Sequence, residues 1–244
     1  MFEITKNHIK HIRFLQQKKY RQEFCQFVVE GEKNVEELLN SEIEIENIFA
    51  TSDWITENHH TEVIVITNKQ LSQISNLSSP NKVLAVAKIP KIDLDNKIFN
   101  SDLTLVLEDI NDPGNLGTII RTADWYGIKN IICSKNSVDC YNPKVVQSTK
   151  GSLFRTSIFY CDLAEVLSDI KNPVYGAVLG GNEIDSGTKF EFPSVLIMGS
   201  ESHGISEELL GFVTNKISIK QYGEAESLNV AIATGVLISR LIDN

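Results

Sequence analysis

The polar and apolar positions of the 244-residue chain form two successive α/β patterns. In the first, a helical pattern at 32–41 places Val35, Leu38 and Leu39 on one side. Apolar runs with the composition of strands lie at 25–31, 44–50, 61–67 and 82–89. This first pattern predicts a small α/β domain over residues 1–90, followed by a charged, proline-led linker without periodicity at 91–102.

The second pattern, over residues 103–244, alternates continuous apolar runs with longer helical stretches. Strands are expected at 103–110, 130–134, 156–160, 174–180, 194–198 and 215–220, and helices at 115–126, 142–150, 162–171, 205–213 and 228–242. Such alternation is typical of a mostly parallel sheet with helices on both faces. In these sheets ligands bind beyond the carboxyl ends of the strands, where the unusual polar residues of this chain also lie.

Composition indicates an ordinary globular protein, with 42% hydrophobic and 23% charged residues. Apolar runs of about eight residues are too short to span a bilayer, and the opening MFEITKNHIK has no signal-peptide core. We therefore expect a cytoplasmic protein. The cysteines at 25, 133, 140 and 161 show no C-x-x-C spacing, which predicts neither a metal site nor a disulfide framework. The pair His59–His60 is interpreted as an exposed loop.

The charge distribution leaves two interpretations open. A net charge of −9 disfavours non-specific binding of nucleic acid, but residues 1–21 carry six basic residues against Glu3 alone. This stretch is either a basic arm that grips RNA phosphates, with Lys18, Lys19 and Arg21 as the candidate contacts, or a solvated N-terminal helix.

The helix predicted at 115–126 carries an arginine away from its apolar side. That side comprises Leu116, Ile119, Ile120, Ala123 and Gly127. Arg121 lies off this face, one turn before Trp125. It is either a solvated residue stacked on Trp125 or a guanidinium held free for a ligand.

Three loops carry the candidate chemistry. In the first, NDPGNLG, Asn115 is a candidate cap for a helix starting at Leu116, and no dinucleotide or Walker glycine pattern is present. In the second, GSESHGIS, Gly199 and Gly204 bracket Glu201, and Ser206 is a candidate cap; a plain turn is the alternative.

The third loop, GEAESLN, precedes the last helix. Ser227 is a candidate cap for that helix. Asn229 would then lie inside the helix, where asparagine is unfavourable, so we expect it to have a polar partner outside.

Taken in order, the three loops resemble the SpoU/TrmH-type RNA 2′-O-ribose methyltransferases of the SPOUT superfamily. The motifs are N-x-x-x-x-x-R, G-x-E-x-x-G and S-L-N-V, within residues 103–244. Residues 1–90, through FVVEGEKNVEELL, resemble the L30e/L7Ae-like RNA-binding domain. The resemblance implies methyl transfer from S-adenosylmethionine to a ribose 2′-hydroxyl of structured RNA, with 23S rRNA favoured over tRNA. The alternatives are a non-catalytic RNA-binding protein and a small-molecule enzyme with a Rossmann-like fold.

The resemblance also implies a C-terminal trefoil knot and a homodimer with its active sites at the subunit interface. It implies site residues, residue by residue. The catalytic positions would be Arg121, Asn115, Glu201, Ser227 and Asn229, and the cofactor would contact Gly199, Ile219, Leu228, Leu179 and Gly180. One departure is Lys220-Gln221 where the family usually has Pro-Met. Arg121 would act either as a phosphate anchor or as a base assisted by Ser227.

Overall fold

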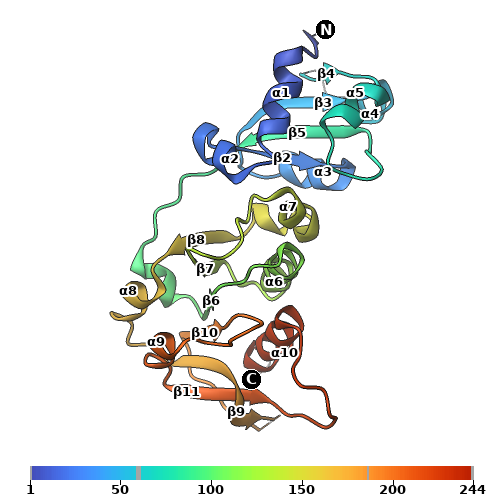
Figure 1. Ribbon diagram of the computed structural model, residues 1–244. Coiled ribbons are helices and arrows are strands. Elements are labelled where there is room, and N and C mark those ends of the chain that lie inside the picture. The colour runs from blue at the N-terminus through green and yellow to red at the C-terminus, as the bar shows by residue number, and fades with distance from the viewer. Residues whose placement is uncertain (1, 59–61, 186, 243–244) are drawn as a thin grey trace. The chain divides into compact units, whose positions relative to one another are not determined.

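The computed structural model describes residues 2–58, 62–185 and 187–242 (Figure 1). The pair His59–His60 lies outside these residues. The chain divides into two compact units. Unit 1 comprises the chain up to Lys91 together with the segment Asp139–Arg155, and unit 2 comprises Ile92–Val138 and the chain from Thr156 onwards. Among the described residues, no helix is both long and apolar enough to cross a bilayer.

Unit 1 contains a mixed five-stranded sheet in the order β1-β4-β3-β5-β2. Its strands are β1 (Phe2–Glu3), β2 (Gln26–Glu30), β3 (Ile45–Ala50), β4 (Ile64–Val65) and β5 (Val83–Lys88). Its helices are α1 (Lys6–Phe14), α2 (Lys18–Phe24), α3 (Glu32–Leu39), α4 (Ser52–Asn58), α5 (Asn68–Ile74), α7 (Pro143–Thr149) and the 3₁₀ turn η2 (Ser152–Phe154). The short helices α4 and α5 were not evident from the hydrophobic pattern.

Capping and burial explain the helix α1. Thr5 and His8 form a capping box at its start, and Ile12 is buried in the core with Leu15, which lies just past its end. These side chains pack with Phe49 and Leu84 of the sheet. The helix therefore buries one side and leaves its basic residues on the other.

The segment Asp139–Arg155 is where the compact units differ from the predicted domains. We expected it within the domain at 103–244, but it packs with unit 1. The Phe27 ring lies 4.7 Å from that of Tyr141, and Asn34 donates to Gln147 at 2.8 Å. Such contacts between residues more than a hundred positions apart leave no mark on the local hydrophobic pattern.

Unit 2 contains a six-stranded sheet in the order β11-β9-β10-β6-β7-β8, with all five pairings parallel. Its strands are β6 (Leu103–Leu107), β7 (Asn130–Ser134), β8 (Ser157–Cys161), β9 (Val174–Ile184), β10 (Ser194–Met198) and β11 (Asn215–Ile219). Its helices are η1 (Asn96–Asn100), α6 (Pro113–Trp125), α8 (Leu163–Leu167), α9 (Glu207–Leu210) and α10 (Val230–Ile242). The prediction of a mostly parallel sheet is confirmed.

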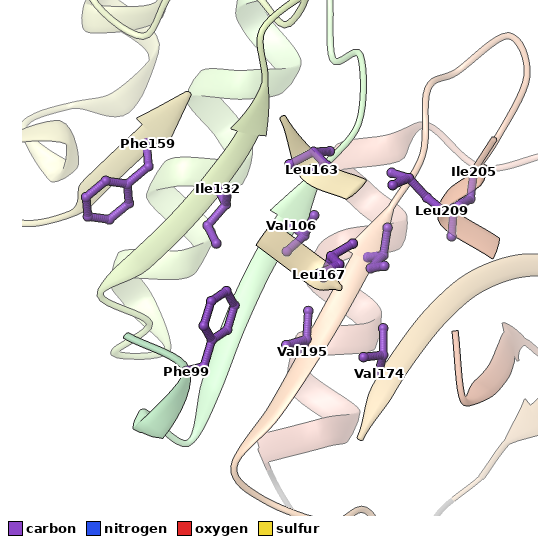
Figure 2. Packing of buried hydrophobic residues seen from close by; sticks show 11 residues of the cluster. Phe99, Val106, Ile132, Phe159, Leu163, Leu167, Val174, Val195, Ile205 and Leu209 are labelled. Atoms are coloured by element: carbon purple, nitrogen blue, oxygen red, sulfur yellow. The ribbon is translucent and has the colours of Figure 1, made fainter. Parts of the chain in front are cut away.

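Helices cover both faces of this sheet, as predicted (Figure 1). Figure 2 shows the core on one face, where Phe99 of η1, Leu163 and Leu167 of α8, and Leu209 of α9 meet the sheet. The sheet contributes Val106, Ile132, Phe159, Val174, Val195 and Ile197. Helices α6 and α10 pack together on the other face. Because strand residues alternate between the faces, one buried strand such as β6 supplies both cores.

The cysteines provide a test of this core. Burial raises the pKa of the Cys133 thiol well above its ordinary value, whereas Cys25 is exposed. We therefore expect iodoacetamide at pH 8 to modify Cys25 in the folded protein and Cys133 only after denaturation. Mass spectrometry of the labelled peptides measures this. Equal rates at the two cysteines in the folded protein would contradict the packing of β7.

Candidate active site

The site lies at the carboxyl edge of the unit 2 sheet. Strands β6 and β10 run in parallel, and Leu107 lies opposite Met198. The loops that follow the two strands therefore begin side by side. The first leads into α6 and the second carries Glu201. The third loop joins β11 to α10, the helix that packs on α6.

Helix α6 begins at Pro113, three residues before the start at Leu116 that the sequence indicated. Asp112 is the N-cap, and its carboxylate accepts a hydrogen bond from the Asn115 backbone at 2.8 Å. Pro113 occupies the first turn, where its missing N–H costs nothing. The interpretation of Asn115 as the cap was therefore wrong, because Asp112 takes that role and leaves the Asn115 side chain available for other contacts.

Helix α6 buries the predicted apolar side. Leu116, Ile119, Ile120 and Ala123 are buried, whereas Gly127 lies beyond the helix end and is exposed. Arg121 is exposed, as its angular position predicted. Within the described part of the chain, Arg121 has no recorded hydrogen bond, ion pair or ring contact, so the structure does not support the predicted stacking on Trp125.

The second loop is a tight turn that presents Glu201 to solvent. Ser200 and Gly204 exchange backbone hydrogen bonds at 3.0 Å in both directions. A Cβ on Gly199 would lie only 2.0 Å from the carbonyl carbon of Gly204, so Gly199 permits this close approach. Ser206 caps α9, as predicted.

In the third loop, Asn229 caps α10, and the expected cap Ser227 does not. The helix begins at Val230, and Asn229 Oδ1 accepts from the backbone N–H groups of Ala231 and Ile232 at 2.9 and 3.3 Å. Asn229 therefore flanks the helix and is not inside it. Ser227 is exposed, without a recorded hydrogen bond within the described residues.

Asn229 also has the external partner that its position predicted. Its Nδ2 donates to Asn115 Oδ1 at 3.0 Å, and Asn115 Nδ2 in turn donates to Glu201 Oε1. Three loops that are far apart in sequence thus meet in one chain of hydrogen bonds, from Glu201 through Asn115 to Asn229. All donors and acceptors in this series of hydrogen bonds are neutral amides except the Glu201 carboxylate. The hydrogen bonds therefore hold one negative charge at the edge of the sheet.

Two acidic residues that support these loops do not stand out in the sequence motifs. Glu108 accepts a hydrogen bond from the Ser206 backbone at 2.9 Å and so links the first loop to the second. Asp109 adopts φ 51° and binds the Ser134 hydroxyl. A pair of carboxylates directly after a buried strand is the signal that could have identified them.

The candidate cofactor residues lie around the same edge. Strand β9 pairs Gly176 with Lys216 and Asn182 with Ile217, so the residues between Gly176 and Asn182 bulge out of the strand. This bulge contains Leu179, which is 81% exposed, and Gly180, which has φ 74°. Since Gly176 also pairs with Ile197 of β10, the bulge begins beside Gly199.

The other two candidates follow β11. Ile219 is half-buried at the end of that strand, and Leu228 is 49% exposed in the loop before α10. The departure at Lys220-Gln221 has a structural role here. Gln221 Nε2 donates to the carbonyls of Gly223 and Ala225 at 2.7 and 2.9 Å. Gln221 thereby shapes the loop, although a glutamine does not restrict the backbone as proline does.

The three candidate RNA contacts in unit 1 differ from one another. Lys18 and Lys19 are exposed, but Arg21 is buried. Its guanidinium donates twice to Asp139 Oδ2, at 2.6 and 2.9 Å, and to the carbonyls of Leu15 and Gln16. The prediction of Arg21 as an RNA contact was therefore wrong, since every edge of its guanidinium is used inside the unit.

Comparison with known proteins identifies this arrangement. The model of the SpoU rRNA Methylase family matches residues 102–239, and that of the MRM3-like substrate binding domain matches residues 6–85. The chain belongs to the SpoU rRNA methylase family.

Relatives and solved structures match the chain along nearly its full length. The 23S rRNA (guanosine(2553)-2′-O)-methyltransferase RlmP of Bacillus subtilis is 29% identical, over 98% of each chain. A TrmH-family protein from Porphyromonas gingivalis has a TM-score of 0.87 at 34% identity, over 97% of each chain. An AdoMet-bound rRNA methyltransferase from Sinorhizobium meliloti has a TM-score of 0.86 at 30% identity, over 98% of this chain and 95% of the other.

Gly199 offers a test of the second loop. In Gly199→Ala the added methyl would meet the Gly204 carbonyl carbon at 2.0 Å, and backbone cannot yield as a flexible side chain does. We expect the turn to open and the affinity for S-adenosylmethionine to fall by about tenfold or more, equivalent to at least ~1.4 kcal/mol. Calorimetric titration measures this. Gly187→Ala is the control, because the atom nearest to its added methyl group would be Asp185 Oδ1, at an ordinary contact distance of 3.6 Å. Wild-type affinity in Gly199→Ala would contradict the role of this turn.

Proposed function

We propose that this chain transfers the methyl group of S-adenosylmethionine to a ribose 2′-hydroxyl of 23S ribosomal RNA. The observation that carries the proposal is the hydrogen-bonded chain Glu201–Asn115–Asn229, which joins the three loops at the carboxyl edge of the parallel sheet. The family of the chain and the name of its full-length relative RlmP agree with this reaction and this RNA.

The residues at the β9–β10–β11 edge fit S-adenosylmethionine. Leu179 and Leu228 expose apolar side chains suited to the faces of an adenine ring. A Cβ added at Gly180 would meet no other atom within 4 Å, so there is open space beside this residue. We assign Gly199, Ile219, Leu228, Leu179 and Gly180 to this pocket. When bound, the sulfonium supplies an electrophilic methyl group.

The polar residues are assigned to orienting the RNA. A ribose hydroxyl is a weak nucleophile and needs alignment with the methyl group and removal of its proton. Arg121 exposes a guanidinium with five N–H donors, which suits bidentate binding of the phosphate beside the reacting ribose. Asn115, Glu201 and Asn229 hold the loops and accept or donate hydrogen bonds at the reacting edge. Ser227 lies exposed in the third loop, where it is assigned to contact with the substrate.

Several further features belong to the same proposal. Residues 103–244 form the methyltransferase domain, with its C-terminal chain in a trefoil knot. Residues 1–90 form an L30e/L7Ae-like domain that binds substrate RNA, in which Lys18 and Lys19 remain candidate contacts. Residues 91–102 are the linker, and the protein acts in the cytoplasm.

We also propose a homodimer, supported by exposed apolar side chains on α6 and α10. Trp125 is 86% exposed, and Ile232 and Val236 are exposed one turn apart on α10. Ile232→Glu is expected to shift the protein from dimer to monomer in sedimentation velocity at micromolar concentration, because it places a charge in the apolar contact. A wild-type protein that is already monomeric would contradict the dimer.

Labelled methyl transfer tests the reaction. Purified protein, methyl-labelled S-adenosylmethionine and unmodified 23S rRNA should yield label in RNA, recovered as a 2′-O-methylated nucleoside after digestion. Unmodified tRNA and a small-molecule extract serve as alternative acceptors. Label in tRNA alone would overturn the assigned RNA, and no label in any RNA would overturn the enzymatic proposal in favour of a non-catalytic RNA-binding protein.

A further inference from the structure

Helix α1 bounds a surface hollow of about 280 Å³ in unit 1, lined by Lys6, Ile9, Lys10, Arg13 and Phe14. The three cations are spaced by four and three residues and so share one side of the helix. All three are exposed, and no carboxylate lines the hollow among the described residues. The apolar side chains of Ile9 and Phe14 also line the hollow, and the three exposed cations around it form a local positive cluster on a protein whose net charge is −9.

This arrangement costs the isolated helix stability. Lys6 and Lys10 are like charges at positions i and i+4, which repel each other. Lys6 also lies in the first turn, where the helix dipole disfavours a cation, and α1 contains no acidic residue to offset either effect. An anion bound in the hollow removes both penalties.

Aromatic rings hold the cations in place before any ligand binds. Lys10 Nζ lies 5.4 Å from the centroid of the Phe14 ring, and Lys19 Nζ lies 5.7 Å from that of Tyr20. The two rings are themselves stacked, with centroids 4.4 Å apart and an interplanar angle of 16°. The ring stack therefore links the hollow on α1 to Lys19 on α2.

Arg13 is oriented in a similar way. Its Nε donates to the Gln73 carbonyl at 2.9 Å, which restrains the guanidinium, and its terminal N–H groups make no other hydrogen bond among the described residues. Because these cations are already positioned, binding a phosphate costs less side-chain entropy than it would for free lysines.

A second face of unit 1 is already covered. Helix α3 contacts the segment Asp139–Arg155, through Asn34 to Gln147 and Glu37 to Arg155. Phe27 of β2 packs on Tyr141 of the same segment. The positive surface of α1 is thus the more accessible of the two for a large polyanion.

We propose that the α1 phosphate site, comprising Lys6, Lys10, Arg13 and Lys19, binds phosphodiester groups of the substrate RNA. This inference rests on the proposed function for the identity of the RNA. It places the main RNA contacts of unit 1 on α1 and the stacked rings, in place of the buried Arg21.

The test is the salt dependence of RNA binding by the full-length protein. The triple variant Lys6→Gln, Lys10→Gln, Arg13→Gln should bind a labelled, unmodified 23S rRNA transcript more weakly. Every phosphate that the protein no longer neutralises reduces the slope of log K against log salt by about 0.7–0.9, so the slope should fall by about two units. Circular dichroism verifies that the variant is folded, and the single variant Lys10→Glu provides an independent measurement with less change to the helix.

A matched control removes the same charge elsewhere. Lys91, Lys129 and Lys171 are exposed, and their triple glutamine variant should keep the wild-type slope within about half a unit. An unchanged slope in the α1 variants, or an equal loss in the control, would overturn the α1 phosphate site.

Methyl transfer measured over a range of RNA concentrations separates this inference from the proposed function. The α1 variants should need a higher RNA concentration to reach half of the maximal rate, because the site binds RNA and does not touch the reacting atoms. If the wild-type protein methylates RNA but the α1 slope is unchanged, only the α1 site fails. If the slope falls as expected but the wild type transfers no methyl group, the α1 site stands and the proposed reaction fails.

Discussion

Arg121→Ala is expected to slow methyl transfer by about a hundredfold or more, equivalent to ~3 kcal/mol of transition-state stabilisation. The reason is that its exposed guanidinium has no recorded partner within the described chain and is assigned to the phosphate beside the reacting ribose. Because it contributes little to packing, the free energy of unfolding should change by less than about 0.5 kcal/mol. Single-turnover rates at saturating RNA and cofactor measure the effect.

Two further variants separate the roles of Arg121. Arg121→Lys keeps the charge but lacks the planar fork, so an anchor that makes two parallel hydrogen bonds should remain mostly inactive. Lys129→Ala, which removes an exposed cation just beyond α6, should keep the wild-type rate. Near-normal turnover in both Arg121 variants would return this residue to a solvated position without a catalytic role.

Arg21→Ala is expected to lower the free energy of unfolding by about 3–5 kcal/mol, the cost of breaking a buried ion pair on one side. The substitution leaves the Asp139 carboxylate, which is 14% exposed, without its cationic partner. It also leaves the carbonyls of Leu15 and Gln16 without their donor. Denaturant titration measures the loss. It should be far larger than that of Lys18→Ala, whose side chain is exposed on the same helix.

A double-mutant cycle isolates the pair. Asp139→Asn keeps Oδ1, which accepts from the Tyr141 backbone at 2.9 Å, but removes the charge that faces Arg21. In the combined variant the two losses should therefore not add, with a coupling free energy of about 1 kcal/mol or more. Additive losses would show that Arg21 stabilises unit 1 through its carbonyl contacts alone.

The hydrophobic pattern predicted much of the fold and part of the site. The 3.6-residue period correctly placed Arg121 away from the buried side of α6, because that side depends only on local spacing. The prediction that Asn229 has an external polar partner is confirmed by its bond to Asn115. The start of α6 was misplaced although the Asp112-Pro113 pair gave a local signal for it.

The local hydrophobic pattern could not predict features that depend on contacts between residues far apart in the sequence. Arg21 resembles any basic residue in a charged arm, and its burial follows from Asp139, 118 positions later in the chain. The bulge in β9 likewise depends on its register with β11, so a strand expected to end at 180 continues to Ile184. Local spacing carries no information about such pairings.

The most direct test of the central claim is a map of ribose 2′-O-methylation in a strain that lacks the gene. Ribosomal RNA and tRNA from the deletion strain are compared with those from strains complemented by the wild type or by Arg121→Ala. We predict that one 2′-O-methyl group of 23S rRNA disappears on deletion, returns with the wild type and stays absent with Arg121→Ala. An unchanged map in both classes of RNA would contradict the account.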